Sequence, residues 1–507
     1  MKNLLIALLL FFPLFIFSQD FSFEKGSILK DRQFLIDNNE ISAVDKNGNF
    51  VSIRPHWING SLRNYFVEFY NDLSFTSRKE ISTKNTTQIL KVFVRDNKAH
   101  VLIKEIAKER VEVRFDIINL ANSELTKQKL ISIDKEVDSE IFKALKSDTN
   151  IIIDYTHRIL ISFPFVKNKQ LFTQTYVFNN ELNILYKSTY SPNPDISKNH
   201  ISFLNAFQHN NKEYLLFNYK IDDQKHYHLV ELNNNDSKDL LIPVDHNFYE
   251  IINSTISNNS LIISGLVSEK RKGSYKGFSY YKVDLQSFAL KNQKYSPFIS
   301  KNISTYFHGL FKGDRDVDLQ NIFVDSNSDI YIVGQFYKPI KQTIPIGPTA
   351  FLSVGSITVF ITYNPISFKT KEKIYDDILV AKIGKDGSLI WDNLLELRTT
   401  TKAKSISYHR DSSYFTFFDN DQINILMNGY IDLEKDKLIV KQDKRKGKTN
   451  FYDVIISPEG KITPNILLSN SDFEVIFKAH KTLTTNNDAL YILGQGNMRK
   501  QLIKLKF

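Results

Sequence analysis

The chain has 507 residues, with 66 Lys and Arg against 56 Asp and Glu, 42% hydrophobic residues and no Cys. This apolar share and mild charge balance are typical of a globular protein and not of a disordered one. The absence of Cys excludes disulfide frameworks, thiolate zinc sites, thiol nucleophiles, c-type haem attachment and a lipid-modified cysteine. Composition therefore indicates a folded protein, but no specific biochemical function.

Residues 1–18 are typical of a removable secretory signal. Lys2 precedes the apolar run Leu4–Phe17, and Ser18 is a small residue suited to cleavage. The run is too short to span a bilayer, which needs roughly 20 residues. We expect residues 19–507 to be exported as a single domain without a transmembrane segment, because no later apolar run reaches about 18 residues.

The net charge of +10 is spread over the whole chain. The two densest basic clusters are short, at residues 270–272 and 444–448. A nucleic-acid-binding protein needs a contiguous basic face with stacking aromatic residues, which the sequence lacks. We therefore interpret these clusters as solvated loops and expect no nucleic-acid partner.

Short apolar runs separated by Asn, Asp and Gly turns indicate β-strands, and long helical periodicity is absent. One set of turns precedes a hydrophobic run in each repeat, at residues 45–49, 96–98, 147–150, 209–212, 257–260, 325–329, 419–422 and 486–488. A second set follows at 71–72, 119–123, 179–180, 233–236, 284–287, 385–388 and 457–461. Two turns per repeat give four strands, here called A to D. We predict an all-β fold, a β-propeller of eight four-stranded blades, with seven blades as the alternative.

The two ends of the repeat series complement each other. The last repeat shows A, B and C strands near residues 473–477, 490–493 and 501–507, but no fourth strand. Residues 21–29 are strand-like and precede the first repeat. We predict that this N-terminal strand pairs with the last blade and closes the propeller, which removes exposed sheet edges. The third repeat is the least regular, because residues 157–167 do not fit the strand count cleanly.

One repeat carries a family resemblance. Residues 314–394 contain Asp318–Asp325, Tyr331–Gly334, Asp377–Ile383 and then an Asp386-Gly387 turn followed by Trp391. This pattern resembles the repeat of exported bacterial β-propeller proteins, which ends with an Asp-Gly turn and a Trp on the outer strand. The resemblance implies a propeller and export, and it implies no catalytic residues. We expect export to the periplasm, or to the extracellular space or cell surface, of a Gram-negative-type bacterium.

The connections differ between the two faces of the predicted blades. The A-to-B and C-to-D turns are short, whereas the B-to-C and D-to-A connections vary, with B-to-C insertions at about 338–375 and 432–449. Binding residues concentrate in loops on a rigid scaffold, so we expect the working surface on the variable face. The apolar stretch Phe351–Thr362 in the first insertion is interpreted either as a lid or interaction flap, or as a hairpin that extends its own blade.

Histidines are frequent in four consecutive D-to-A connections. His200, His246, His308 and His409 each occur in one of these segments, and Asp316, Asp318 and Arg410 occur nearby. At a channel mouth, such imidazole and carboxylate groups would form a binding site or an acid and base pair. The alternative is a set of unrelated polar loop residues. His226 and His228 lie two residues apart on a strand, where we expect a solvated face and no metal.

No motif for a cofactor, a phosphate-binding loop or a nucleophile elbow occurs. With only Trp57 and Trp391, the chain lacks the repeated Trp of quinone-dependent propeller enzymes. We therefore predict a secreted or periplasmic scaffold that binds a protein or glycan through one loop face, and we favour a binding protein without a cofactor over an enzyme. The alternatives are a polysaccharide hydrolase or lyase with a channel-mouth site, and a structural component of the cell surface.

Overall fold

The computed structural model describes residues 22–506 apart from 31–39, 59–60, 84–85, 147–150, 156–157, 169, 192–201, 222–223, 234–236, 245–248, 270–273, 305–315, 347–348, 355–356, 363–365, 400–413, 435–436, 443–449, 470–473, 478, 480–481, 485–488 and 497–498. The predicted signal, residues 1–18, lies outside this range. The chain divides into two compact units, which are described separately: unit 1 comprises residues 1–105, 114–128 and 472–507, and unit 2 comprises 106–113 and 129–471.

The fold is all-β, with eight blades of four antiparallel strands, and is a β-propeller as predicted. Blade 1 contains β3 (Ile41–Val44), β4 (Asn49–Ile58), β5 (Ser61–Asn71) and β6 (Ser74–Ser82), and blade 2 contains β7 (Thr86–Arg95), β8 (Lys98–Ile106), β9 (Arg110–Asn119) and β10 (Leu125–Asp134). Blade 3 contains β11 (Ile151–Tyr155), β12 (Arg158–Lys167), β13 (Gln170–Phe178) and β14 (Ile184–Tyr190). Blade 4 contains β15 (Ser202–His209), β16 (Lys212–Ile221), β17 (Gln224–Leu232) and β18 (Lys238–Ile242).

Blade 5 contains β19 (Tyr249–Ser257), β20 (Ser260–Ser268), β21 (Tyr275–Asp284) and β22 (Ala289–Pro297). Blade 6 contains β23 (Asp316–Val324), β24 (Ile330–Ile346), β27 (Ile366–Ile383) and β28 (Leu389–Thr399). Blade 7 contains β29 (Tyr414–Asp419), β30 (Gln422–Glu434), β32 (Asn450–Ile456) and β33 (Ile462–Leu468). Blade 8 contains β34 (Ile476–Phe477), β35 (Leu483–Thr484), β36 (Ala489–Gly496) and β37 (Arg499–Lys506), and is completed by β1 (Ser22–Lys25) and β2 (Leu29–Lys30).

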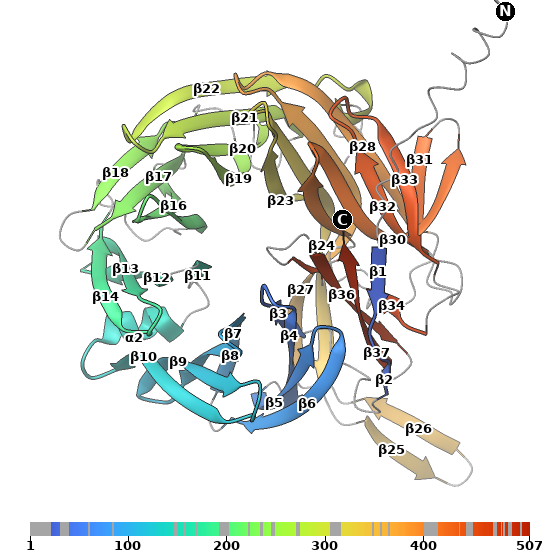
Figure 1. The fold of residues 1–507 in the computed structure, drawn as a ribbon. Coiled ribbons are helices and arrows are strands. Elements are labelled where there is room, and N and C mark those ends of the chain that lie inside the picture. Colours follow the sequence, from blue (N-terminus) through green and yellow to red (C-terminus); the bar gives the residue numbers. More distant parts are fainter. Residues whose placement is uncertain are drawn as a thin grey trace, which may run out of the picture. The chain divides into compact units, whose positions relative to one another are not determined.

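The position of a strand within its blade matches its pattern of side chains. In blade 5, the second strand, β20, reads Ser-Leu-Ile-Ile-Ser-Gly-Leu-Val-Ser and is buried almost throughout. The fourth strand, β22, alternates between exposed and partly buried residues. A strand covered on both faces requires a continuous apolar run, whereas a strand at the edge of a sheet alternates. In unit 2, Figure 1 accordingly shows the fourth strands β18 and β22 on the outside and the first strands β19 and β23 inside.

Blade 8 is completed by the strand that the sequence predicted. β1 pairs antiparallel with β37, with Ser22 opposite Lys506 and Lys25 opposite Ile503, and β2 continues the same edge. The N–H of Gly26 donates to the carbonyl of Leu502 between these two segments. The free edge of β37 is therefore covered by residues from the other end of the chain.

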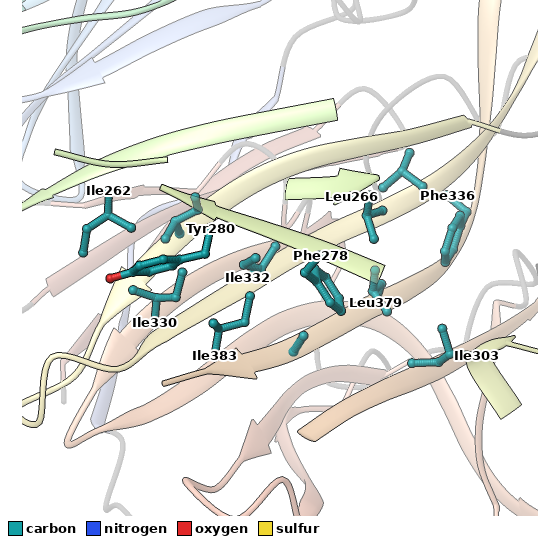
Figure 2. Close-up of a cluster of buried hydrophobic side chains, with 13 residues drawn as sticks. Ile262, Leu266, Phe278, Tyr280, Ile303, Ile330, Ile332, Phe336, Leu379 and Ile383 are labelled. Atoms are coloured by element: carbon teal, nitrogen blue, oxygen red, sulfur yellow. The ribbon is translucent and has the colours of Figure 1, made fainter. Parts of the chain in front are cut away.

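Facing blades are held together by apolar layers. Between blades 5 and 6, Phe278 and Tyr280 of β21 pack with Ile332 of β24 and Leu379 of β27, all almost fully buried. Figure 2 shows these side chains interleaved between the strands of the two blades. Burial of such side chains contributes about 1.5–3 kcal/mol each, so these layers are the main source of cohesion between blades.

A second contact recurs between neighbouring blades: the outer strand of one blade holds the C-to-D turn of the next. In unit 2, Trp391 on β28 donates its indole N–H to the Pro458 carbonyl at 2.8 Å. Ser296 on β22 donates to the Gly387 carbonyl at 2.9 Å, and Ser188 on β14 contacts Ser237 at 3.1 Å. Gly387 and Gly460 have φ near +85°, so these turns require glycine. Trp391 thus packs on the turn of blade 7, while the Asp386-Gly387 turn of its own blade is held by Ser296 of blade 5.

The third repeat differs from the prediction. Its first two strands are β11 and β12, which pair from Ile151 opposite Ser162 to Tyr155 opposite Arg158. The A-to-B connection therefore lies between Tyr155 and Arg158, and not at residues 147–150, which lie outside the described residues. An unpredicted helix, α2 (Ser139–Lys146), precedes this blade and buries Phe142 and Leu145.

The two predicted insertions form β-structure. β24 and β27 remain paired from Ile330 opposite Ile383 as far as Ile346 opposite Ile366, and beyond them β25 (Thr349–Val354) pairs with β26 (Ile357–Thr362). The first insertion therefore extends the strands of its own blade. In the second, β31 (Lys437–Gln442) pairs with β30 and runs parallel to the end of β28, which links blades 6 and 7.

One buried carboxylate lies where β28 leaves its own blade. Asp377 of β27 is 8% exposed and accepts a hydrogen bond from the N–H of Leu397 at 2.6 Å. The β27–β28 ladder ends one residue pair earlier, at Ile378 opposite Leu395. From Glu396 onward, β28 pairs with β31 instead. The carboxylate thus satisfies a backbone group at the point where the strand changes partner.

Candidate functional site

Long connections in unit 2 occur at one edge of the blades. Measured between strand bounds, every A-to-B and C-to-D connection has between two and five residues. The D-to-A connections are longer: Pro297 ends β22 and Asp316 begins β23, and Thr399 ends β28 and Tyr414 begins β29. Both B-to-C insertions leave from this same edge. The candidate functional surface, called here the long-connection face, is therefore the edge of unit 2 that carries the D-to-A and B-to-C connections.

Most of the predicted site residues fall outside the described part of the chain. His200, His246, His308, His409 and Arg410 all belong to segments that the structure does not describe. Asp316 is the first residue of β23, and only its backbone is described. Asp318, two residues further along β23, is half-buried. Convergence of the four histidines therefore stays a prediction.

The second pair of histidines does not match its prediction. His228 on β17 is 2% exposed, and its ring stacks on Phe217 at 5.8 Å. Its Nδ1 lies 3.7 Å from the Asp239 carboxylate. The prediction of a solvated strand face is wrong for His228, because the aromatic layer between the strands covers it. Within the described ranges, no three His, Asp or Glu residues are grouped closely enough to hold a metal ion.

The inner strands of blades 4 to 7 are joined by side-chain amides. Asn205 of β15 donates to the Ser254 hydroxyl of β19 at 2.9 Å. Asn253 of β19 donates to the backbone carbonyls of Leu319 and Gln320 on β23 at 3.3 and 2.9 Å. Asn321 of β23 donates to the Thr416 hydroxyl of β29. We call Asn205, Asn253, Ser254, Asn321 and Thr416 the inner amide ladder.

Local backbone geometry places these amides. The register of β15 with β16 shifts between Phe203 and Asn205, and that of β23 with β24 shifts between Leu319 and Asn321. Such bulges turn one residue out of the regular alternation and are common next to functional sites. The Asn205 side-chain oxygen also accepts the N–H of Ala206 at 2.8 Å, which fixes the amide plane. The sequence signal is an Asn within the apolar first strands of blades 4, 5 and 6, at positions 205, 253 and 321.

Two of the long connections are anchored by carboxylates. Asp392 of β28 accepts hydrogen bonds from the N–H groups of Ile299 and Ser300 at 3.1 and 2.7 Å, at the start of the connection from blade 5 to blade 6. Burial raises the pKa of Asp392, although these hydrogen bonds oppose the shift. Asp138 accepts the N–H of Ile141 at 2.9 Å and caps helix α2 in the connection that enters blade 3. Both connections therefore leave the blades in a fixed direction.

The described part of this region supplies neutral hydrogen-bonding groups on rigid strands. An Asn side chain has two donor hydrogens and two acceptor lone pairs, and a hydroxyl offers one donor and two lone pairs. Such groups are suited to orienting a ligand rich in hydroxyl groups.

No family model and no curated protein matches the sequence. Among solved structures, the polysaccharide lyase Uly1 is similar over 94% of this chain and 99% of its own, with 10% identity and a TM-score of 0.41. The polysaccharide lyase PL25-ulvanlyase, bound to -[GlcA(1-4)Rha3S]-, is similar over 81% and 90%, with 9% identity and a TM-score of 0.37.

The acylaminoacyl peptidase of Pyrococcus horikoshii is similar over 80% of this chain and 60% of its own, with 11% identity and a TM-score of 0.33. Polysaccharide lyases and a peptidase are similar to this chain to a comparable extent, so the similarity does not assign an activity to it. Among the residues the structure describes, no helix combines the length and apolar character that crossing a bilayer requires.

Proposed function

We propose that this protein is an exported binding scaffold, and that its ligand is a glycan held at the long-connection face of unit 2. The observation that carries the proposal is the confinement of long connections to one edge of the blades, while the opposite edge has turns of two to five residues. Loops that vary on a rigid scaffold are where binding residues concentrate. The resemblance of residues 314–394 to exported bacterial propeller repeats supports the export part of the proposal.

The inner amide ladder supports a glycan over an apolar ligand. Its members are neutral, and they are held in place by hydrogen bonds that join consecutive first strands. Sugar hydroxyls need donors and acceptors in fixed positions, which these strands supply without the entropic cost of ordering a loop. The four histidines and Arg410 would add charged or switchable contacts at the same edge if the ligand carries carboxylate or sulfate groups.

The proposal is tested by affinity gel electrophoresis of the exported chain in gels that contain neutral, uronate-rich or sulfated polysaccharides. We expect retardation by at least one of these polymers. Substitution of His200, His246, His308 and His409 together by Ala should weaken the retardation. The matched control is His209→Ala, because His209 ends β15 at the short-turn edge, where it contacts Asn259 and not a long connection.

Two results would contradict the proposal: no retardation by any polymer, or equal retardation of the four-histidine variant and the parent. The polymer recovered after incubation is also sized by gel filtration. An unchanged chain length agrees with a binding scaffold. Shortening by the parent but not by the four-histidine variant would instead establish the alternative, a polysaccharide hydrolase or lyase.

A further inference from the structure

The strand that completes blade 8 is attached differently from the outer strands of the other blades. In blades 1 to 7, each fourth strand follows its third strand after a turn of two to five residues. The β1 strand instead reaches β37 from the opposite end of the chain. No short turn keeps it beside β37, so β1 and β2 regain more conformational entropy on separation than another outer strand would.

Side chains add little to this attachment. All four residues of β1 are exposed, as are Ser27, Ile28 and Lys30. By contrast, the outer strands β6, β10, β14, β18 and β22 each bury at least one side chain. The ion pair between Glu24 and Lys506 is exposed, so it contributes little. Because few apolar contacts accompany the backbone pairing, we expect β1 and β2 to open locally before the rest of unit 1.

The edge of β37 is nevertheless selective for the strand that it binds. The N–H of Gly26 donates to the Leu502 carbonyl, and the Gly26 carbonyl accepts a hydrogen bond from the side-chain amide of Gln501, both at 2.9 Å. A Cβ at residue 26 would lie 2.4 Å from the carbonyl oxygen of Leu73, in the turn between β5 and β6. A backbone oxygen does not move aside as a flexible side chain does. A strand that pairs here therefore needs glycine at this position.

We propose that β1 and β2 form an exchangeable strand, and that β37 also binds this strand from a second copy of the chain, which joins two molecules. A second copy supplies glycine at position 26 and places Glu24 opposite Lys504, whereas an unrelated peptide would have to match both. Exchange keeps every contact of the closed molecule. It is opposed by the effective concentration of the molecule's own strand, on the order of millimolar for a short connection. Closed monomers therefore predominate in dilute solution, and exchanged assemblies increase with concentration.

The test uses two variants of the full exported chain that each carry one cysteine, Ser22→Cys and Lys506→Cys. The natural chain has no Cys, so neither variant forms a disulfide within one molecule. The two variants are unfolded in urea, refolded together and oxidised. Because positions 22 and 506 are directly opposed, we expect a disulfide-linked dimer with one chain of each kind, identified by peptide mass. The cross-linked fraction should rise about tenfold for each decade of protein concentration while closed monomers predominate.

Two controls separate exchange from random collision. The register control mixes Ser22→Cys with Lys504→Cys, whose positions are two residues out of step. The recognition control adds Gly26→Ala to the Ser22→Cys chain, and its matched substitution is Ser27→Ala at the exposed neighbouring residue. We expect Gly26→Ala to lower the cross-linked fraction at least about tenfold, because the added Cβ clashes with backbone. Ser27→Ala should change the fraction less than about twofold.

Circular dichroism checks that each variant folds, and the register control does not depend on Gly26→Ala. The proposal is overturned if no disulfide forms between position 22 of one molecule and position 506 of another, or if its yield is independent of protein concentration. It is also overturned if the Lys504→Cys mixture gives an equal yield, or if Gly26→Ala and Ser27→Ala lower the yield equally.

Discussion

The Lys500 ammonium of β37 lies 2.6 Å from the Glu68 carboxylate of β5, and both side chains are almost completely buried. The two residues are 432 positions apart in the chain. Lys500 also donates to Glu40 and, at 3.0 Å, to the hydroxyl of Ser52. Burial alone would lower the pKa of Lys500, but the carboxylates of Glu40 and Glu68 raise it above its usual range. The ammonium therefore stays charged inside unit 1, where it joins blade 8 to blade 1.

This buried cation predicts an unequal effect of two lysine substitutions on the same strand. Lys500→Met should lower the free energy of unfolding by about 3–5 kcal/mol, because it leaves Glu40 buried without this ammonium, whereas Glu68 keeps its ion pair with Arg78. Lys506→Met is the control, since Lys506 pairs with Glu24 in an exposed ion pair, which contributes about 0–1 kcal/mol. Urea unfolding measures both. Equal losses would contradict the assignment of a buried ionic centre.

The inner amide ladder predicts a loss of stability without a loss of apolar burial. Asn253→Ala removes the donor to the carbonyls of Leu319 and Gln320, so we expect a loss of about 1–3 kcal/mol. Amide hydrogen exchange should quicken in β23 before it changes elsewhere. Asn122→Ala, in an exposed turn of blade 2, should have little effect. Exchange that stays unchanged in β23 would show that the amide does not couple blades 5 and 6.

A buried carboxyl in blade 7 predicts a dependence of stability on pH. Asp453 is completely buried, and no ordinary hydrogen bond to its side chain is found among the described residues. Burial raises its pKa from 3.8 to about 7, although the Ile425 N–H opposes this shift. The unfolded chain loses this proton near pH 4 and the folded chain near pH 7. The contribution of Asp453 to stability is therefore full below about pH 4 and is lost as pH rises to 7.

Asp453→Asn removes the free-energy cost of ionising a buried carboxyl group. Relative to the parent, the variant should gain stability between pH 4 and pH 7, by at most about 4 kcal/mol, with no further gain above pH 7. Asp421→Asn should behave oppositely, because hydrogen bonds from Ser326 lower the pKa of Asp421. Replacement of Asp421 therefore lowers stability above about pH 4, and this loss shrinks as the pH falls below 3.8. Denaturant unfolding at pH 4.5 and 8 tests Asp453→Asn, whereas Asp421→Asn is compared at pH 5 and below about pH 3, because the lowered pKa of Asp421 lies under 3.8. A pH-independent difference between Asp453→Asn and the parent would refute the buried-acid assignment.

The contact between outer strands and turns predicts a position that tolerates only glycine. Gly460 has a φ of +84°, and a Cβ placed there would lie 2.9 Å from the Trp391 ring. Gly460→Ala should therefore cost more than about 1 kcal/mol and change the fluorescence of Trp391. Gly384→Ala is the control, because Gly384 has no positive φ and its nearest neighbour is the side chain of Asp386. Trp fluorescence that is unaffected by Gly460→Ala would show that the turn does not pack on the indole.

The number of blades could be predicted from the sequence because each repeat carries its own turns. Asp45 accepts the N–H groups of Asn47 and Asn49, and Asp325 accepts those of Asn327 and Asp329, so the same local chemistry closes both A-to-B turns. The prediction of an A-to-B turn at residues 147–150 failed, because that polar run follows a helix and not a strand. Residues 147–150 follow α2, whose Phe142 and Leu145 are one helical turn apart, and a strand-based count overlooked that spacing.

The charged centre and the inner amides could not be predicted in the same way. Glu68 and Lys500 each occur in an apolar strand, and nothing local to either residue indicates the other. Their pairing depends on the placement of β1 and β37 in one blade, which brings the two ends of the repeat series together. The change of partner by β28 is likewise non-local, because it depends on Asp377 and on a strand of the following blade.

The most direct test of the account is a disulfide between Ser22→Cys and Lys506→Cys, because the completion of blade 8 defines the order of strands from which both faces are assigned. These positions are directly opposed in the β1–β37 ladder, within the spacing that a disulfide bridges, and the natural chain has no Cys. We predict an oxidised, circularised chain with altered mobility in a non-reducing gel. The pair Ser22→Cys with Lys504→Cys, two residues out of register, should oxidise poorly. Failure of the first pair to form, or equal oxidation of both, would contradict the fold described here.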